Sequence, residues 1–263
     1  SDGGPALVMV PDPVARGRRG LPWVASAVAL AAVTGAVVWS LRPPPAPLRV
    51  DAVSVTLPDG VGLPRDLAVL AALSPDGQHL VYVGERDGTR QLYHRRLDQF
   101  TPVQIADTEG ASSPFFSPDG QWIGFRVGSI LRKVRLAGGS AETVCDLPGT
   151  EFANAAGWSD DGTIWFGSIH RGLFQVADTG GVAREVTTPN ASGTVVGHYA
   201  PHPLPGGRAI LYTAYGADDL TTTVNLYLPE TDEHRELALG SRPWFAPSGH
   251  VVFSGSGSSN PTG

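Results

Sequence analysis

One short turn sequence recurs at a nearly fixed spacing along this chain. Its clearest copies are Ser74-Pro75-Asp76-Gly77 and Ser117-Pro118-Asp119-Gly120, and a run of β-branched and aromatic residues follows each of them. Three looser copies end at Gly162, Gly207 and Gly249, so that the last glycines lie 42 to 45 residues apart. A fixed period of about forty residues, filled by strands rather than helices, is typical of a β-propeller in which each repeat supplies one blade.

The residue types of this turn explain its recurrence. Proline presets φ at the second position of a type I turn, aspartate suits the third position, and glycine accepts a positive φ at the fourth. We therefore expect these residues to build the framework of the repeat. The predicted turn residues are Ser74, Pro75, Asp76, Gly77, Ser117, Pro118, Asp119, Gly120, Ser159, Asp161, Gly162, Pro205, Gly207, Pro247 and Gly249.

Each repeat contains four short stretches typical of strands. The stretch after the turn is apolar, a second follows another turn, the third is more polar, and the fourth leads into the next turn with pairs such as Phe115-Phe116 and Gly157-Trp158. We expect each repeat to form one four-stranded blade, with the strand after each turn lining the central funnel. A long β-sandwich is the alternative all-β fold, but it does not require a constant period.

The repeats account for about four blades and the start of another, which predicts an incomplete all-β propeller over residues 50–263. We therefore expect the chain to be a fragment of a longer protein. Residues 50–57 have the alternating apolar pattern of a strand that completes a closing blade. Without its partner blades, the region 60–253 is expected to form an open arc with an exposed apolar end face.

Composition supports a turn-rich all-β protein and argues against nucleic-acid binding. The 263 residues include 33 Gly and 23 Pro but only one Met, and the formal net charge is −6. A basic surface for nucleic acid is not expected at this charge. Cys145 is the only cysteine. An intrachain disulfide is thereby excluded, and we expect Cys145 to be a small buried residue of a third strand.

An uncharged apolar segment precedes the repeats. Residues 21–41 carry no charge, and at about 1.5 Å per residue a helix of this length crosses a hydrocarbon core about 30 Å thick. Trp23 and Trp39 lie near its two ends, where indole rings favour the boundary between water and lipid. A cleaved signal peptide is the alternative, but its apolar core usually has only about 7–15 residues. The sequence therefore predicts one uncleaved transmembrane helix over residues 21–41.

Charges and prolines around this segment predict its orientation. Arginines gather before it, which predicts that residues 1–20 form a cytoplasmic juxtamembrane tail. Residues 42–49 are rich in proline and are expected to form a stalk. The expected protein is a single-pass protein of the cell inner membrane, with the propeller in the periplasm or outside the cell.

The repeats resemble the WD40-like repeats of the TolB type, called PD40 repeats. The order of segments resembles the region that follows the kinase domain in bacterial receptor-like serine/threonine protein kinases. A basic tail, a span and a proline-rich stalk come first, and then the runs 73–82 and 116–125, Leu131-Arg132-Lys133-Val134 and Gly138-Gly139. In that family a cytoplasmic kinase domain precedes the span and the propeller lies outside the cytoplasm. The resemblance implies a sensing or protein-interaction module that binds a protein or a small ligand on the propeller face.

The catalytic motifs of kinases and of serine peptidases are missing from the sequence. No glycine-rich phosphate loop, Val-Ala-Ile-Lys strand or Asp-Phe-Gly occurs, and the stretch 94–98 (His-Arg-Arg-Leu-Asp) lacks the asparagine of a kinase catalytic loop. No Gly-x-Ser-x-Gly turn of a peptidase occurs either. His198 and His202 would share a face only on a helix, which the neighbouring prolines forbid. We therefore predict a non-enzymatic chain with no catalytic, cofactor-binding or metal-binding residues.

Two classes of function remain open from the sequence. One is the extracytoplasmic sensor of a transmembrane kinase, and the other is a periplasmic interaction scaffold of the TolB kind without a kinase. An accessory propeller of a prolyl-oligopeptidase-type peptidase is a third alternative. Binding is expected on the face that carries the turns or in the central funnel, and loop tips at 85–88, 169–172 and 217–220 differ between repeats.

Overall fold

The chain is built from strands and turns throughout its described part. The computed structural model describes residues 57–66, 69–148, 152–189, 193–217, 221–246 and 248–255, which all belong to one unit spanning residues 53–263. These residues contain eighteen strands and no helix, in agreement with the predicted all-β fold. A helix able to cross a membrane is accordingly absent from these ranges. The predicted tail 1–20, span 21–41 and stalk 42–49 lie outside the described residues and stay predictions.

The strands form two antiparallel sheets of four, one sheet of eight and a final hairpin. The two halves of the sheet of eight are joined by a single pair of residues, and we divide it there into two groups of four, so that the four groups are called blades 1 to 4. Blade 1 consists of β1 (Ala71–Leu73), β2 (His79–Arg86), β3 (Thr89–Arg96) and β4 (Val103–Gln104), and blade 2 of β5 (Ala111–Phe116), β6 (Trp122–Val127), β7 (Ile130–Arg135) and β8 (Glu142–Asp146). Blade 3 consists of β9 (Phe152–Trp158), β10 (Thr163–Ser168), β11 (Leu173–Ala177) and β12 (Arg184–Glu185). Blade 4 consists of β13 (Val195–Pro203), β14 (Ile210–Gly216), β15 (Thr222–Leu228) and β16 (Glu233–Leu239), and the hairpin of β17 (Ser241–Phe245) and β18 (Val251–Ser254).

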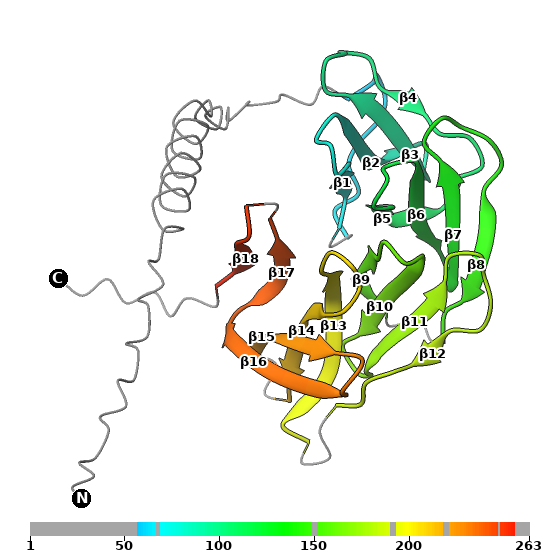
Figure 1. Cartoon of the computed structure of the whole chain (residues 1–263). Coiled ribbons are helices and arrows are strands. Elements are labelled where there is room, and N and C mark those ends of the chain that lie inside the picture. The colour runs from blue at the N-terminus through cyan, green and yellow to red at the C-terminus, as the bar shows by residue number, and fades with distance from the viewer. Residues whose placement is uncertain are drawn as a thin grey trace, which may run out of the picture. The chain divides into compact units, whose positions relative to one another are not determined.

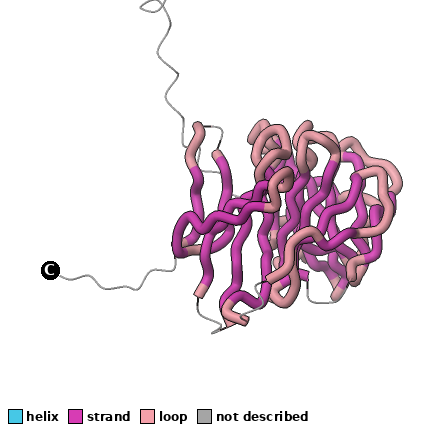
Figure 2. The backbone as a smooth tube through the Cα atoms, turned by 60° about the horizontal axis from the view of Figure 1, so that its bottom comes forward, coloured by secondary structure: helices cyan, strands magenta, loops and turns pink. Residues whose placement is uncertain are grey.

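The blades are arranged radially. The first strand of each blade lies beside the first strand of the next, so that β1, β5, β9, β13 and β17 form a continuous series. Figure 1 shows these strands toward the centre, whereas β4, β8, β12 and β16 lie at the periphery. Figure 2 shows that the strands run between two sets of loops. We call the side with the β1–β2, β5–β6, β9–β10 and β13–β14 turns the turn face, and the opposite side, with the loops that follow, the hairpin face.

The structure corrects one part of the predicted blade. The strand that leads into each turn was expected to be the fourth strand of the preceding blade, but it pairs with the strand after the turn, as β5 does with β6. A turn of so few residues reverses the chain directly, and its two flanking strands must pair with each other. The strand before each turn is therefore the innermost one and lines the centre, in place of the strand after the turn.

Consecutive turns lie close together on the turn face. The Gly206 backbone N–H donates a 3.0 Å hydrogen bond to Oδ2 of Asp160 in the preceding turn. A Cβ atom on Gly120 would lie 3.7 Å from Cδ of Pro75, which belongs to the turn of blade 1. The repeated turns thus follow one another from blade to blade along the same face, as a radial arrangement requires.

The core lies between the blades, because each sheet buries its faces against its neighbours. Val81, Val83 and Leu92 of blade 1 pack against Ile123 and Phe125 of blade 2, and all five side chains are fully buried. Burial of an apolar side chain of this size stabilises the fold by about 1.5–3 kcal/mol. An aromatic residue recurs at one register of the strand after the turn, and the first four copies are buried; these residues are Tyr82, Phe125, Phe166, Tyr212 and Phe253.

The two end sheets of the described region differ in how their outer faces are covered. In blade 1, Val61 packs against Tyr82 and Tyr93, and Gly62 forms a backbone bridge to Glu85. In the final hairpin, by contrast, Trp244 is 53% exposed. The expected apolar end face is therefore present at the hairpin, whereas the segment 57–66 covers the corresponding face of blade 1.

Candidate functional site

The side chains of the predicted turns are engaged in hydrogen bonds within the turns themselves. In the first turn the Ser74 hydroxyl donates to Oδ1 of Asp76 and accepts a 2.9 Å hydrogen bond from the His79 backbone N–H. Gln78 N–H donates to the same carboxylate at 3.0 Å. The Ser74 hydrogen bond, followed by that of Gln78, holds the pKa of Asp76 below its ordinary value. The turn at Ser117 repeats every one of these contacts.

The third turn is one residue shorter than the first. The Ser159 N–H bonds to the carbonyl of Thr163, four residues on, whereas in the first turn the corresponding bond spans five residues. Asp161 still accepts from the Thr163 N–H at 2.9 Å. The Ser159 hydroxyl, however, is buried without a hydrogen-bond partner among the described residues. In the longer turns this serine accepts a hydrogen bond from the backbone N–H five residues on, and the shorter third turn does not supply that N–H.

The glycine that ends each turn has a positive φ in all five copies. The values are 70° at Gly77, 69° at Gly120, 81° at Gly162, 66° at Gly207 and 84° at Gly249. This is the left-handed region that favours glycine. Of the other turn residues, Pro75, Pro118 and Pro205 lie at the second position of their turns, whereas Pro247 lies outside the described residues.

A bulge in the innermost strands was missed by the sequence analysis. Ser113, Ala200 and Arg242 have φ values of 52°, 50° and 54°, and the pairing register shifts around each of them. Each lies four residues before its turn and is followed by a proline, as in Ser113-Pro114. Blades 1 and 3 have Ala71 and Ala156 at the place of the proline and no left-handed residue beside it. The proline three residues before the turn is the signal that predicts the bulge.

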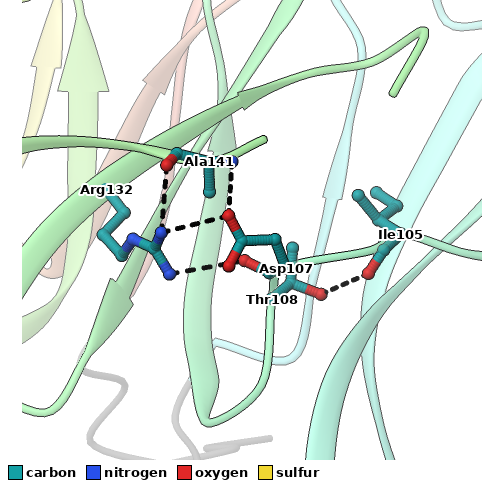
Figure 3. A network of polar contacts seen from close by, with 5 residues as sticks. All are labelled: Ile105, Asp107, Thr108, Arg132 and Ala141. Carbon is teal, nitrogen blue, oxygen red and sulfur yellow. Dashed lines mark hydrogen bonds and ion pairs between the residues drawn. The ribbon is translucent and has the colours of Figure 1, made fainter. Parts of the chain in front are cut away.

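A polar network joins the outer part of blade 1 to blade 2 (Figure 3). Asp107, in the loop after β4, accepts a 2.8 Å hydrogen bond from the Ala141 N–H and lies 3.3 Å from Nη2 of Arg132. Arg132 also donates to the Ala141 carbonyl at 3.0 Å. The Ala141 N–H, followed by Arg132, lowers the pKa of Asp107. Beside it, the Thr108 hydroxyl donates to the Ile105 carbonyl at 2.7 Å. The contacts of Asp107 therefore connect blade 1 to blade 2.

A similar threonine in blade 3 is hydrogen-bonded to a buried histidine. Thr108 accepts a hydrogen bond from the Leu92 N–H, and Thr187 accepts one from the Leu173 N–H at 2.8 Å. Thr187 Oγ1 also lies 2.8 Å from Nδ1 of His198. The two atoms share a hydrogen bond in which the tautomer of the ring decides which of them donates, because a hydroxyl that accepts from the backbone still has a second acceptor lone pair as well as its proton.

This histidine belongs to a cluster of rings on the face of blade 4 that packs against blade 3. The His198 ring lies 4.8 Å from the Tyr212 ring and 6.0 Å from the His234 ring, measured between centroids. The Tyr212 hydroxyl in turn lies 2.9 Å from Nδ1 of His234. Burial, and then the proximity of His234, lower the pKa of His198 to about 4, although Glu185 opposes this shift.

The other residues considered in the sequence have structural contacts. Cys145 is buried, as predicted, but it lies in β8, the fourth strand of blade 2 rather than a third strand; its burial raises the pKa of the thiol to about 11. His94, in the stretch that resembles a catalytic loop, lies 2.8 Å from a ring nitrogen of His79. His202 stacks on Trp244 with ring centroids 5.1 Å apart. Within the described ranges, no three His, Cys, Asp or Glu side chains are grouped in a way that could hold a metal ion.

The variable loop tips that the structure describes lie on the hairpin face. The tips at 85–88 and 169–172 connect the second and third strands of blades 1 and 3, and the tip at 217–220 has the same place in blade 4. Residues 218–220 of the last tip lie outside the described residues. Equivalent positions of a repeated scaffold thus carry different residues on one face, which makes the hairpin face the candidate binding surface.

Comparison with known proteins supports the fold. No protein-family model matches the chain. An uncharacterized protein of Agrobacterium fabrum is 36% identical over 78 residues, which are 28% of this chain and 27% of that protein. TolB from Acinetobacter baumannii superposes with a TM-score of 0.59 at 18% identity, over 71% of this chain and 48% of TolB. The chain thus spans less than half of that TolB and about a quarter of the Agrobacterium protein.

Two further solved structures show the same architecture. A putative TolB from Agrobacterium tumefaciens has a TM-score of 0.57 at 19% identity, over 70% of this chain and 72% of that one. The β-propeller domain of Cps50 (Swd1) from Myceliophteria thermophila has a TM-score of 0.54 at 14% identity, over 73% and 64%. At these identities the likeness concerns the fold alone. The described part of the chain is a TolB-like β-propeller.

Proposed function

We propose that this chain is a non-catalytic protein-interaction module that binds its partner on the hairpin face. One observation carries the proposal. The side chains that recur from blade to blade form contacts within the propeller itself, whereas the residues of the hairpin-face loops differ between blades. The Ser74 and Asp76 side chains bond within their own turn, and Phe125 is buried between blades. Such a scaffold presents variable loops at fixed positions, which is how propellers with unrelated partners generate specificity.

Site-specific photo-crosslinking tests the proposed binding face. A photoreactive phenylalanine analogue is placed at Thr89 or Ser129, both exposed beside the hairpin-face loops, in cells of the source organism. Matched positions on the turn face are Gln78 and Gln121, which are also exposed. We expect discrete covalent adducts from the hairpin-face positions and none from the turn-face positions. The absence of adducts from all four positions, or equal adducts from both faces, contradicts the proposal.

We further propose that the module is anchored in the inner membrane through residues 21–41 and acts as the extracytoplasmic sensor of a serine/threonine kinase. The support lies in the sequence: an uncharged segment of 21 residues, arginines before it and a proline-rich stretch after it. Alkaline phosphatase fused after residue 255 is expected to be active, and the same fusion after residue 20 inactive. The reverse pattern contradicts the orientation, and an upstream reading frame without a kinase domain contradicts the kinase association.

A further inference from the structure

An arginine interrupts the apolar pattern between blades 2 and 3. Arg126 lies near the end of β6 that leads to the hairpin face. At the same register, counted from the strand pairing beside the turn, blade 1 has Val83, blade 3 has Gly167 and blade 4 has Thr213. A charge at this position is therefore specific to blade 2 and is not needed to form a blade.

The guanidinium of Arg126 lacks a counter-ion in the described part of the chain. Its one hydrogen bond there runs from Nε to the Ser112 hydroxyl, at 3.2 Å. By contrast, Arg90, Arg132 and Arg171 each form an ion pair with a carboxylate. Arg126 is partly buried, and this burial lowers the pKa of its guanidinium. A guanidinium has five N–H donors, so most of the donors of Arg126 are left for another acceptor.

A second polar group, without a hydrogen-bond partner among the described residues, lies on β5, the strand that pairs with the strand of Arg126. Ser112, which pairs with Arg126 across the two strands, is buried. Ser113 follows it in the left-handed bulge, and the Ser113 hydroxyl is buried without a hydrogen-bond partner in the described ranges. Buried polar groups are nearly always hydrogen-bonded, so an unpaired hydroxyl on the residue next to Ser112, which Arg126 contacts, calls for a specific explanation.

We propose that Arg126 and Ser113 bind a carboxylate group that enters from the hairpin face beside the inner strand β5, while the Ser112 hydroxyl, which accepts from Arg126 Nε and donates to the Arg126 carbonyl, orients the guanidinium. A guanidinium presents two parallel N–H donors that match the two oxygens of a carboxylate, and a hydroxyl supplies a further donor. One guanidinium balances one negative charge, which favours a carboxylate over a doubly charged phosphate. The partly buried position shields this pair from water and strengthens it. The site goes beyond the interaction role proposed above, because a partner can bind the hairpin-face loops without it.

The test is a titration of the full 263-residue chain, followed through the Arg126 Nε–Hε signal in ¹⁵N NMR spectra and by calorimetry. The probes are acetate, inorganic phosphate and a capped glycine-glutamate-glycine tripeptide. We expect acetate and the tripeptide to shift the Arg126 signal in a saturable way, and phosphate to bind at least tenfold more weakly. Tighter binding of the tripeptide than of acetate identifies an acidic side chain of a partner protein as the source, and the opposite order identifies a small free acid.

Variants complete the test. In calorimetry, Arg126→Met is expected to lose the acetate response, whereas Arg208→Gln, which removes an exposed arginine of the turn face, retains it. Arg126→Lys keeps the charge without the planar fork and is expected to bind acetate about tenfold more weakly. An Arg126 signal that does not respond to any carboxylate in the unmodified chain overturns the proposal, and so does an acetate response that persists in Arg126→Met. Because the NMR measurement needs no variant, it remains decisive if a substitution prevents folding, and it is independent of the cross-linking result.

Discussion

The buried His198 is expected to make the stability of the propeller depend on pH. Nδ1 of its ring is hydrogen-bonded to the Thr187 hydroxyl, and the ring is buried, so a positive charge on it loses contact with water. The groups that face it are His234 and Tyr212 from blade 4 and Glu185 from blade 3. A protonated His234 would repel a protonated His198, and Glu185 offsets only part of this cost.

The magnitude follows from the pKa of His198. Folding lowers this pKa from 6.5 to about 4, and each unit corresponds to about 1.4 kcal/mol. Between these two pH values the unfolded chain binds a proton on His198 that the folded chain does not bind, so lower pH favours unfolding. The contribution of His198 is complete above pH 6.5 and is lost progressively toward pH 4, by about 3 kcal/mol in total.

Urea denaturation at a series of pH values from 7.5 to 4.5 measures this contribution. His198→Asn supplies an amide oxygen near the position of Nδ1 and cannot be protonated, so its free energy of unfolding is expected to fall much less steeply with pH. His250→Asn is the matched control, since His250 is exposed and lies outside the ring cluster, and it should keep the slope of the unmodified chain. If His198→Asn keeps that slope as well, His198 is not the group that titrates, and the reasoning is refuted.

Three further predictions follow from buried contacts. Thr108→Val removes the acceptor of a buried backbone N–H and is expected to cost about 1–3 kcal/mol in urea denaturation; a loss below about 0.5 kcal/mol contradicts the assigned hydrogen bond. Gly124→Ala places a Cβ atom into the ring of Phe115 and should cost about 3 kcal/mol or more, whereas Gly255→Ala, which meets no neighbouring atom, should be neutral in thermal denaturation. Cys145 should react with a thiol reagent in urea but not in the folded chain, and rapid labelling under native conditions argues against its burial.

Local turn chemistry explains why so much of the fold could be predicted from the sequence. Proline, aspartate and glycine at fixed places in each turn define where a strand begins, and the strands after the turns were found where expected. The assignment of the strand before the turn to the preceding blade was wrong. The repeat period is the same whichever strand is counted first, so periodicity alone does not show where a blade begins. The short turn shows it, because the two strands on either side of such a turn pair with each other.

The candidate site was less predictable because its contacts join residues that are distant in sequence. The bond between Thr187 and His198 depends on how β13 lies against the loop after β12, and no local pattern marks it. The pairing of Arg126 with Ser112 likewise depends on the register of β5 and β6. The bulge at Ser113 is different, since the proline that follows it recurs before two other turns and is visible in the sequence.

Comparison of repeats within one chain separates the residues that form a blade from those that do something else. Every blade must cover its neighbour with apolar surface, and Val83 and Thr213 show that an uncharged side chain at the register of Arg126 is compatible with this packing. A partly buried charge there is costly unless it is paired. When one blade has a destabilising residue at a register where the other blades have uncharged residues, that residue is a candidate for a binding function. On this argument Arg126→Met should raise the thermal stability of the chain without added carboxylate, while the same substitution removes the stabilisation that acetate gives to the unmodified protein.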